Sequence, residues 1–514
     1  MNLSFALVPA WPPLAWLARC EPDTEAVVIS HGPNVEVMDD WFCEAAWDGE
    51  FNDGGFDRTD IVAGSGGRKR SGQLVFVSAG NTVDRLVSLN LAGTILVSNS
   101  LACLAATADL DFLLDHDWHA AFHSIVKGIE HYQSEIPSSR GNILLTYYRN
   151  LVWNGHTLRR VEKPRIHRNL SSFECYYDFL VETLHCVHLN SADNSRRYPF
   201  QLLTTLSTGY DSPTVTAVAK TVAPKVRGFT FGGMEEPSTD SGSEIAGYLG
   251  VDLDIIDIGK WRDSANPEVP HIAADCLGEE VQYTAAASIL SSRILLTGFH
   301  GDVVWGKDID HASENFVRGD PSGLSLTEYR LWANFLHCPI PFWGARQSAD
   351  IVRLSNQQTM HKWDVSGGYS RPICRRIVES SGVPRELFGR KKKAASSWPN
   401  SSAQFLTPQS MENYLQWLEY NRPSLIHGPF STILTSRNAD RIFFKMFKST
   451  QRAAGKLGSI GHSFATLDLV RRPLHWFETV DWANNPKPPW VLPLRRFLFP
   501  WAIDMAKRKY IGDK

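Results

Sequence analysis

Short apolar runs separated by turn residues fill the first 165 residues of the chain. Runs such as EAVVIS, QLVFVSA, GTILVSN and GNILLTYY have the length of strands, and segments such as NDGG and GSGGRKRSG lie between them. This pattern predicts a β-rich N-terminal domain over residues 1–165. We interpret GSGGRKR (Gly64 to Arg70) as a hairpin turn rather than a phosphate-binding loop, because no helix follows it.

The pattern changes after this region. The polar stretch VEKPRIHRNLSS (residues 161–172) predicts a linker, and the apolar positions of SFECYYDFLVETLHCVHLNS (residues 172–191) recur at helical spacing. From residue 199 the apolar runs FQLLTTLS, VRGFTFG, DLDIIDI and RILLTG alternate with helical segments such as SPTVTAVAKTV and SGSEIAGYLG. The alternation predicts a parallel sheet with crossover helices over residues 173–514, with a ligand site at the carboxyl ends of the strands.

Composition narrows the class of protein. A net charge of −3 over 514 residues argues against a general nucleic-acid binder. The sequence has no apolar run of the length that spans a membrane and no signal-peptide pattern at its N-terminus. The eight cysteines form no CxxC pair, which favours reduced thiols in a cytoplasmic protein. We expect the apolar, basic tail (residues 488–514) to pack on the second domain; a membrane surface or a partner helix is the alternative.

The segment Ser207-Thr208-Gly209-Tyr210-Asp211-Ser212-Pro213 carries the clearest chemistry. It follows an apolar strand, and Ser212 and Pro213 suit the N-cap and first position of a helix. A turn of this kind directs backbone N–H groups and a helix dipole at one point, as phosphate binding requires. Asp211 is a hard oxygen ligand suited to Mg²⁺. The alternative is an ordinary strand–turn–helix connection. No GxxxxGK[ST] motif is present, which excludes a P-loop NTPase.

Two further segments fit the same chemistry. The segment Thr297-Gly298-Phe299-His300-Gly301-Asp302 also follows an apolar strand, so Asp302 is expected to share a magnesium–pyrophosphate unit with Asp211. The run Lys391-Lys392-Lys393 offers a cation for developing negative charge, although such runs are more often solvated.

Together these segments resemble the synthetase domain of the asparagine synthetase family, which includes β-lactam synthetases and lasso-peptide cyclases. LSTGYDS is similar to the family's SGGxDS loop, LTGFHGD to its LSGxGxDE segment, and VPRELFGRKKKAASSW to its LPxxxxxRKKxGF segment. The resemblance covers about residues 50 to 400. It implies an α/β ATP-pyrophosphatase domain (adenine nucleotide α-hydrolase-like) preceded by an α+β sandwich of the Ntn-hydrolase, glutaminase-like type.

The resemblance also implies a site. It assigns ATP and Mg²⁺ as cofactors, Asp211 and Asp302 as metal ligands, and Lys392 and Asp211 as catalytic residues, with Lys391 or Lys393 as alternatives to Lys392. The adenine is expected near Leu206 and Phe231. The residues expected to bind the nucleotide are Leu206, Ser207, Thr208, Gly209, Tyr210, Asp211, Ser212, Phe231, Thr297 and Gly298.

Three departures from the family pattern refine this expectation. Position 2 is Asn2 and the nearest cysteine is Cys20, so glutaminase activity is not expected. Phe299 stands where β-lactam synthetases have a tyrosine that helps to deprotonate the amine; His300 is a possible substitute, although shaping the loop is its more ordinary role. Thr208 stands where the first glycine of the SGGxDS loop normally falls, and its Cβ makes the loop more open there; Tyr210 follows the retained Gly209.

The sequence therefore predicts an ATP-dependent ligase that adenylates a carboxylate and transfers the acyl group to an amine. The substrates are a small-molecule or peptide carboxylate and an amine, with a homodimer or a biosynthetic partner protein as an open option. The alternatives are a catalytically inactive scaffold with the same fold, and an adenylating enzyme that transfers sulfur or modifies RNA. The scattered cysteines and slight acidity disfavour the last.

Overall fold

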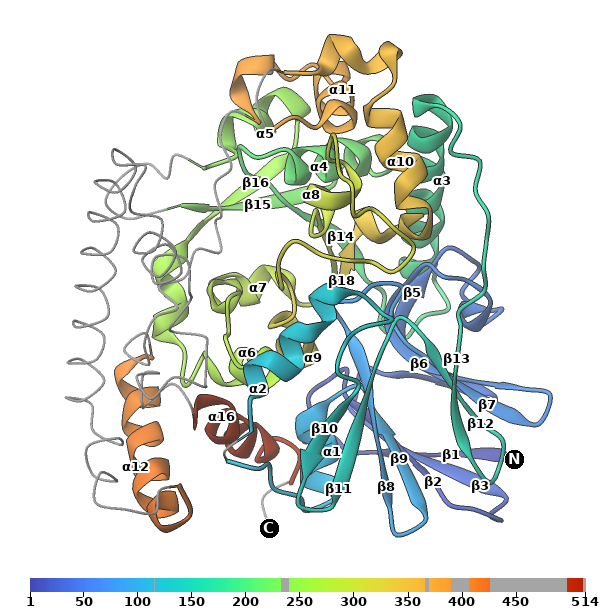
Figure 1. Cartoon of the computed structure of the whole chain (residues 1–514), viewed down its shortest axis with the longest axis vertical. Helices are drawn as coiled ribbons and strands as arrows, with labels where there is room; N and C mark the ends of the chain where they lie inside the picture. The colour runs from blue at the N-terminus through green and yellow to red at the C-terminus, as the bar shows by residue number, and fades with distance from the viewer. Residues whose placement is uncertain (115, 233–239, 366–368, 390–405, 426–496, 512–514) are drawn as a thin grey trace, which may run out of the picture.

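The structure, a computed structural model, describes residues 1–114, 116–232, 240–365, 369–389, 406–425 and 497–511. These residues build two mostly antiparallel sheets from the N-terminal third of the chain and one parallel sheet with surrounding helices from the remainder. In Figure 1 the blue N-terminal strands lie at the lower right, and the parallel sheet lies above them.

The two N-terminal sheets pack face to face around a shared apolar core. Trp16 from one sheet stacks on Phe76 of the other with ring centroids 6.0 Å apart, and Phe42 meets Trp16 edge-on at 5.1 Å. All three side chains are buried, so the aromatic contacts bind the layers together. One sheet has seven strands in the order β1-β3-β2-β9-β8-β11-β10 and the other has six in the order β13-β12-β7-β6-β5-β4.

The strands of the first sheet are β1 (Asn2–Leu7), β2 (Trp16–Cys20), β3 (Ala26–His31), β8 (Arg85–Leu91), β9 (Thr94–Ser98), β10 (Glu135–Ser138) and β11 (Gly141–Tyr147). Those of the second are β4 (Glu36–Met38), β5 (Trp41–Trp47), β6 (Val62–Arg70), β7 (Gln73–Val77), β12 (Asn150–Trp153) and β13 (Leu158–Val161). The helices of this region are α1 (Leu101–Thr107) and α2 (Trp118–His123).

The glycine-rich segment GSGGRKR is not a turn, as the sequence predicted, but the body of strand β6. A Cβ at Gly64 would overlap the carbonyl oxygen of Glu44, and one at Gly66 would overlap that of Phe42. The glycines therefore let β6 lie against β5 more closely than side chains allow. The turn itself comes later, at Ser71 and Gly72, both of which have positive φ.

The third sheet is wholly parallel, with the order β16-β15-β14-β17-β18. Its strands are β14 (Gln201–Thr205), β15 (Arg227–Gly232), β16 (Asp252–Asp257), β17 (Arg293–Thr297) and β18 (Phe335–Pro339). The chain starts at β14, moves outward to β16, and returns to add β17 on the other side of β14. The strand order therefore reverses between β14 and β17, where ligands of such sheets bind at the carboxyl ends.

Helices cover both faces of this sheet. Ile294 and Leu296 of β17 belong to the core cluster that contains Val215 of α4, whereas Leu295 belongs to the cluster that contains Leu326 of α9. Because successive side chains of a strand point to opposite faces, a strand buried on both faces has a continuous apolar run. This explains why RILLT and its counterparts were recognisable in the sequence.

The helices of this part are α3 (Phe173–Ser191), α4 (Asp211–Val222), α5 (Ser243–Leu249), α6 (Val269–Asp275), α7 (Ala287–Leu290), α8 (Gly301–Val304), α9 (Leu326–Ala333), α10 (Ser348–Ser355), α11 (Pro372–Ser380), α12 (Pro408–Leu425) and α16 (Leu498–Lys507). In Figure 1, α4, α5 and α11 lie above the parallel sheet, α6, α7 and α9 lie below it, and α12 and α16 lie at the lower left. The strands and helices predicted from apolar runs between residues 172 and 298 are confirmed.

The segment after β13 is held firmly. The Lys163 ammonium, 1% exposed, donates to the carbonyl of Ser78 at 2.7 Å and to Asn150 at 2.9 Å. Arg168 forms a buried ion pair with Asp60 at 2.5 Å. The predicted linker has no helix or strand between Val161 and Phe173, and its polar residues anchor it to the N-terminal sheets.

A buried ion-pair network joins the N-terminal sheets to the parallel-sheet part. Arg330 of α9 donates to Glu44 of β5 at 2.6 Å and to Asp84 at 2.9 Å, and none of the three side chains is more than 3% exposed. The two carboxylates would carry a large desolvation cost without this guanidinium. The charges of this network therefore hold the two parts of the chain together.

The C-terminal helix α16 strengthens the same junction. It contacts α6 and α1, and Trp501 is fully buried. After it, Tyr510 donates from its hydroxyl to Glu328 at 2.6 Å, while its carbonyl accepts from the indole of Trp11 at 2.9 Å. Residues 497–511 of the tail thus pack against α6 of the second domain, as expected from the sequence, and also against α1 and Trp11 of the N-terminal part.

The cysteines and the helix lengths bear on the predictions made from composition. All eight cysteines are free thiols. Among the residues that the structure describes, no helix combines the length and the apolarity that a membrane crossing needs.

Candidate nucleotide site

A pocket of about 420 Å³ opens at the carboxyl ends of the parallel strands. Thr205 ends β14, Gly232 ends β15 and Thr297 ends β17, and all three line it. This volume lies within the range typical of small-molecule sites. The sequence predicted a ligand site at the carboxyl ends of the strands, and the structure further places this pocket where the strand order reverses.

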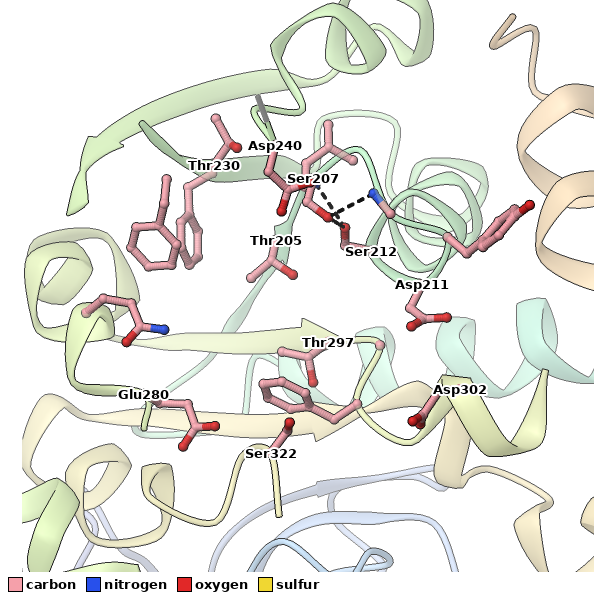
Figure 2. Close-up of a pocket in the computed structure, with 18 of the residues that line it drawn as sticks. Thr205, Ser207, Asp211, Ser212, Thr230, Asp240, Glu280, Thr297, Asp302 and Ser322 are labelled. Carbon is pink, nitrogen blue, oxygen red and sulfur yellow. Dashed lines mark hydrogen bonds between the residues drawn. The ribbon is translucent and has the colours of Figure 1, made fainter. Parts of the chain in front are cut away.

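The loop after β14 forms one wall of this pocket (Figure 2). The Ser212 hydroxyl accepts from the Ser207 amide at 2.9 Å and lies 2.8 Å from the Ser207 hydroxyl. The Gly209 amide donates to Ser207 Oγ at 3.3 Å. Some of the backbone N–H groups that were expected to face a phosphate therefore already donate hydrogen bonds to side chains of the loop.

The helix after this loop begins earlier than predicted. Helix α4 starts at Asp211, with Tyr210 as its N-cap residue, so Ser212 is the second helical residue rather than the cap. Its hydroxyl turns back to Ser207 and brings the loop into a compact turn. Asp211 consequently lies at the positive end of the α4 dipole, where a carboxylate is stabilised.

The loop after β17 approaches Asp211 through two glycines. A Cβ on Gly298 would overlap the backbone and Cβ of Asp211, and one on Gly301 would lie 2.6 Å from its carboxylate oxygen. Asp302 follows in the first turn of α8, as Asp211 does in α4. Both aspartates line the same pocket (Figure 2). The structure therefore brings together the two carboxylates that the sequence placed about ninety residues apart.

Arg371 neutralises one of these carboxylates. Its guanidinium, 6% exposed, forms an ion pair with Asp211 Oδ1 and lines the pocket. The Asp211 carboxylate raises the pKa of Arg371, although burial acts in the opposite direction. Arg371 is the one Arg or Lys among the described residues of the pocket wall, so it is the cation available there to an anionic ligand.

Tyr210 and Thr208 connect the loop to the segment that precedes the lysine run. Tyr210 is fully buried and its hydroxyl accepts from Arg375 at 2.8 Å. The Gly389 amide donates to the carbonyl of Thr208 at 2.9 Å, and a Cβ on Gly389 would overlap the Tyr210 ring. Thr208 itself is not part of the pocket wall. Lys391, Lys392 and Lys393 lie outside the described residues.

The far end of the pocket is apolar and aromatic. Phe231 meets Tyr283 edge-on with centroids 5.4 Å apart, and Phe229 lies 5.4 Å from Phe231. Ile258 and the buried Leu206 also line the pocket. A flat heterocycle suits such a surface, because aromatic faces and edges can both contact it.

His300 has the geometry of a structural residue rather than a base. It adopts a left-handed backbone with φ of 75° and stacks on Phe342 with centroids 4.6 Å apart. Burial, together with the nearby Arg318 and His311, lowers the pKa of His300 to about 3. An imidazole with so low a pKa is a weak proton acceptor, which favours the loop-shaping role for His300.

The pocket contains polar residues that the sequence analysis did not identify. They are Asp240, Glu280, Gln282, Asp320, Ser322 and Arg371. Asp240 accepts from the Thr208 hydroxyl at 2.6 Å and from its amide at 3.2 Å. Asp240 lies between β15 and α5, so the strand-end rule that identified Asp211 could have indicated it. Arg371 and Asp320 follow no strand end, and only the folded chain brings them here.

The side chains of the pocket determine whether a metal ion can bind there. Within the described part of the chain, no group of three or more His, Cys, Asp or Glu side chains is arranged to hold a metal ion. Mg²⁺, however, is commonly held by one or two carboxylates together with phosphate oxygens and water. Asp211 and Asp302 on one pocket wall are compatible with that mode of binding.

Comparison with known proteins adds little. No family model matches the chain, and no curated protein matches it in sequence. Among solved structures, it is similar to a glutamine-dependent NAD+ synthetase from Acinetobacter baumannii in complex with ADP, at 14% identity and a TM-score of 0.23. The match covers 60% of this chain and 51% of that one, so this chain spans about half of that protein. We draw no functional conclusion from so low a score.

Proposed function

We propose that this protein is an ATP-dependent ligase that forms amide bonds. It adenylates a substrate carboxylate with release of pyrophosphate, and an amine then displaces AMP. The observation that carries the proposal is that Asp211 and Asp302, which follow two separate parallel strands, line the wall of one pocket. In this proposal the parallel-sheet part is an ATP-pyrophosphatase domain, and residues 1–165 are a glutaminase-like sandwich without its nucleophile.

The pocket has two chemically distinct ends that match the two ends of ATP. The aromatic end, with Leu206 and Phe231, suits an adenine ring. The loop from Ser207 to Ser212, together with Thr297 and Gly298, suits the triphosphate, since it lies at the N-terminus of α4. Asp211 and Asp302 would hold Mg²⁺, which neutralises charge on the phosphate oxygens.

Arg371 and the lysine run supply further positive charge. Mg²⁺ competes with Arg371 for Asp211, so a bound nucleotide would free the guanidinium to contact a phosphate. Lys392 follows Gly389 by three residues, and Gly389 is hydrogen bonded to the loop. We therefore retain Lys392 as the residue that steadies negative charge during adenylation, with Lys391 and Lys393 as alternatives.

The source of the amine, the location of the protein and its partners also belong to this proposed function. The amine comes from a second substrate, from the same molecule or from free ammonia, because Asn2 offers no nucleophile for glutamine hydrolysis. We propose a cytoplasmic protein that acts alone, as a homodimer or with a biosynthetic partner protein.

A catalytically inactive scaffold is the second candidate. The observations that favour it are the ion pair between Arg371 and Asp211, and the side chains that occupy the loop amides. In both features, a group proposed to bind Mg²⁺ or phosphate is instead bonded to another group of the protein. An enzyme would have to open these contacts when the nucleotide binds.

The two candidates differ in nucleotide chemistry. We would measure Mg·ATP binding by calorimetry, and ATP–pyrophosphate exchange over a panel of standard amino acids and small dicarboxylic acids. The proposal expects Mg-dependent ATP binding, exchange with at least one carboxylate, and loss of exchange by about 100-fold or more in Asp211→Asn. Asp252→Asn is the matched control, because this exposed aspartate lies at the opposite end of the sheet. If the protein binds no Mg·ATP, the scaffold candidate is correct.

A further inference from the structure

Glu280 is a buried carboxylate on the pocket wall that the proposed adenylation does not use. It is 1% exposed and lies just before the short helix Val281–Ala286. Its Oε1 accepts from the Gly323 amide at 2.6 Å, and its Oε2 accepts from the amide of Ser325 at 3.3 Å and from the Ser325 hydroxyl. The loop 323–325 thus fixes the orientation of the carboxylate.

The position of Glu280 is opposite the phosphate loop. In Figure 2, Ser207 and Ser212 lie on one side of the pocket, while Glu280 and Ser322 lie on the other. Gly323, which holds Glu280, has a φ of 91°, and a Cβ there would lie 3.0 Å from the Phe299 ring. Glu280 and Phe299 therefore belong to the same wall. A carboxylate on this wall repels phosphate and attracts a cationic or proton-donating ligand.

The surroundings of Glu280 favour uptake of a proton. Burial is the largest influence and raises the pKa of Glu280; the hydrogen bonds from Ser325 and Gly323 and the charge of Arg318 act in the opposite direction. The charge of Glu280 in turn helps burial to raise the pKa of the neighbouring Asp275 carboxyl. A carboxyl with a raised pKa is a stronger base than an exposed glutamate, as proton abstraction near neutral pH requires.

The other acids of the pocket are less suited to this task. Asp211 forms an ion pair with Arg371, and Asp240 accepts two hydrogen bonds from Thr208. Asp320 is exposed and caps the Ser322 amide at 3.0 Å. Asp302 lines the same pocket as Asp211 and belongs to the proposed metal site. Glu280 alone among these acids is both buried and remote from the phosphate loop.

We propose that Glu280 contacts the amine substrate and accepts its proton when the amide forms. This inference rests on the proposed function, because it concerns the second half of that reaction. The nitrogen lone pair forms the C–N bond, the C–O bond to the phosphate of the acyl-adenylate breaks, and its electron pair leaves on AMP. One N–H proton passes to the Glu280 carboxylate. The second substrate is accordingly ammonia or an amine that carries at least one N–H.

The test separates the two half-reactions in Glu280→Gln. Adenylation is followed by ATP–pyrophosphate exchange, and by hydroxamate formation when hydroxylamine replaces the amine, since hydroxylamine is nucleophilic without a base. Amide formation is followed with ammonium chloride and a panel of primary amines. We expect exchange and hydroxamate formation within about threefold of the native protein, and amide formation lowered by about 100-fold or more. Glu280→Asp, which keeps a carboxylate, should recover part of the amide rate.

Glu279→Gln is the matched control, because this neighbouring glutamate does not line the pocket and the substitution is the same. It should leave both half-reactions unchanged. The inference is wrong if Glu280→Gln forms amide at the native rate, or if it lowers exchange and hydroxamate formation as much as amide formation.

Two other results remain decisive. If Glu280→Gln does not fold, the native protein still provides a test. Each rate is divided by the concentration of unprotonated amine or hydroxylamine at that pH; the ratio of the corrected amide rate to the corrected hydroxamate rate should fall as the pH is lowered and Glu280 becomes protonated, and a flat ratio contradicts the inference. If the native protein neither binds Mg·ATP nor supports exchange, the proposed function fails first, and the role of Glu280 falls with it.

Discussion

At the scale of single residues, the unusual positions are ionisable side chains that are buried inside the protein. Lys163 is the clearest case outside the pocket. It is fully enclosed and bonded to Ser78 and Asn150, and burial lowers the pKa of its ammonium to about 7. In the unfolded chain the same group has its ordinary pKa of 10.5. Its protonation is therefore coupled to folding.

This coupling predicts the direction of a pH effect. Between about pH 7 and pH 10 the unfolded chain binds a proton at Lys163 that the folded protein does not hold, so the contribution of this residue to stability increases as the pH rises. Below pH 7 both states are protonated, and the contribution is constant. We expect the unfolding free energy of the native protein, minus that of Lys163→Met, to increase between pH 7 and pH 9 in urea titrations.

The half-buried Lys69 gives the comparison, because Lys69→Met makes the same substitution near the end of β6 without removing a fully enclosed ammonium. Its difference from the native protein should not vary with pH over this range. A difference for Lys163→Met that is equally flat would contradict the lowered pKa.

At the scale of helices and strands, the sequence predicted best where one simple rule applied. β14, β15 and β17 were found because strands buried on both faces are continuously apolar, and α3 because its apolar residues recur at helical spacing. The start of α4 was misplaced, because Ser212 has the character of an N-cap residue but bonds to Ser207 instead. Strand β6 was misjudged as a turn, because its glycines serve close strand packing.

The residues of the candidate site likewise fall into those that the sequence could predict and those that it could not. Asp211 and Asp302 follow apolar strands, so the strand-end rule indicated both from the sequence. Arg371 and Glu280 reach the pocket through loops whose course no local pattern determines. Which groups surround the two aspartates could therefore be learned only from the folded chain.

Strand β6 offers a prediction about packing. Gly64 has a φ of 103° and no room for a Cβ beside the Glu44 carbonyl, whereas Gly155 has a φ of 101° and no atom within 4 Å of the same position. The two alanine substitutions therefore share their backbone strain and differ only in steric overlap. We expect Gly64→Ala to lower the unfolding free energy by about 1–3 kcal/mol more than Gly155→Ala, measured by urea denaturation. Equal losses would show that β5 and β6 can separate without cost.

At the scale of the whole molecule, the network of Arg330, Glu44 and Asp84 decides how the two parts hold together. Removal of one partner from a buried ion pair leaves uncompensated charge, which costs about 3–5 kcal/mol. We expect Arg330→Met to lower the unfolding free energy by this amount, because Glu44 and Asp84 remain buried. Denaturant unfolding followed by tryptophan fluorescence measures it.

The comparison is Arg353→Met. Arg353 also forms an ion pair, with Asp350, but its side chain is 70% exposed, and exposed pairs contribute little. Its loss should change the unfolding free energy by less than about 1 kcal/mol. Similar losses in both variants would mean that the buried network is not what joins the two parts.

The same network has a consequence for the order of events during translation. The ribosome delivers Glu44 and Asp84 long before Arg330, and Trp11 long before Tyr510. A nascent N-terminal sandwich would have to bury two carboxylates with no cation to meet them, so its final packing must wait until α9 has been synthesised. This protein should therefore depend, more than one with self-sufficient domains, on chaperones that shield the early chain.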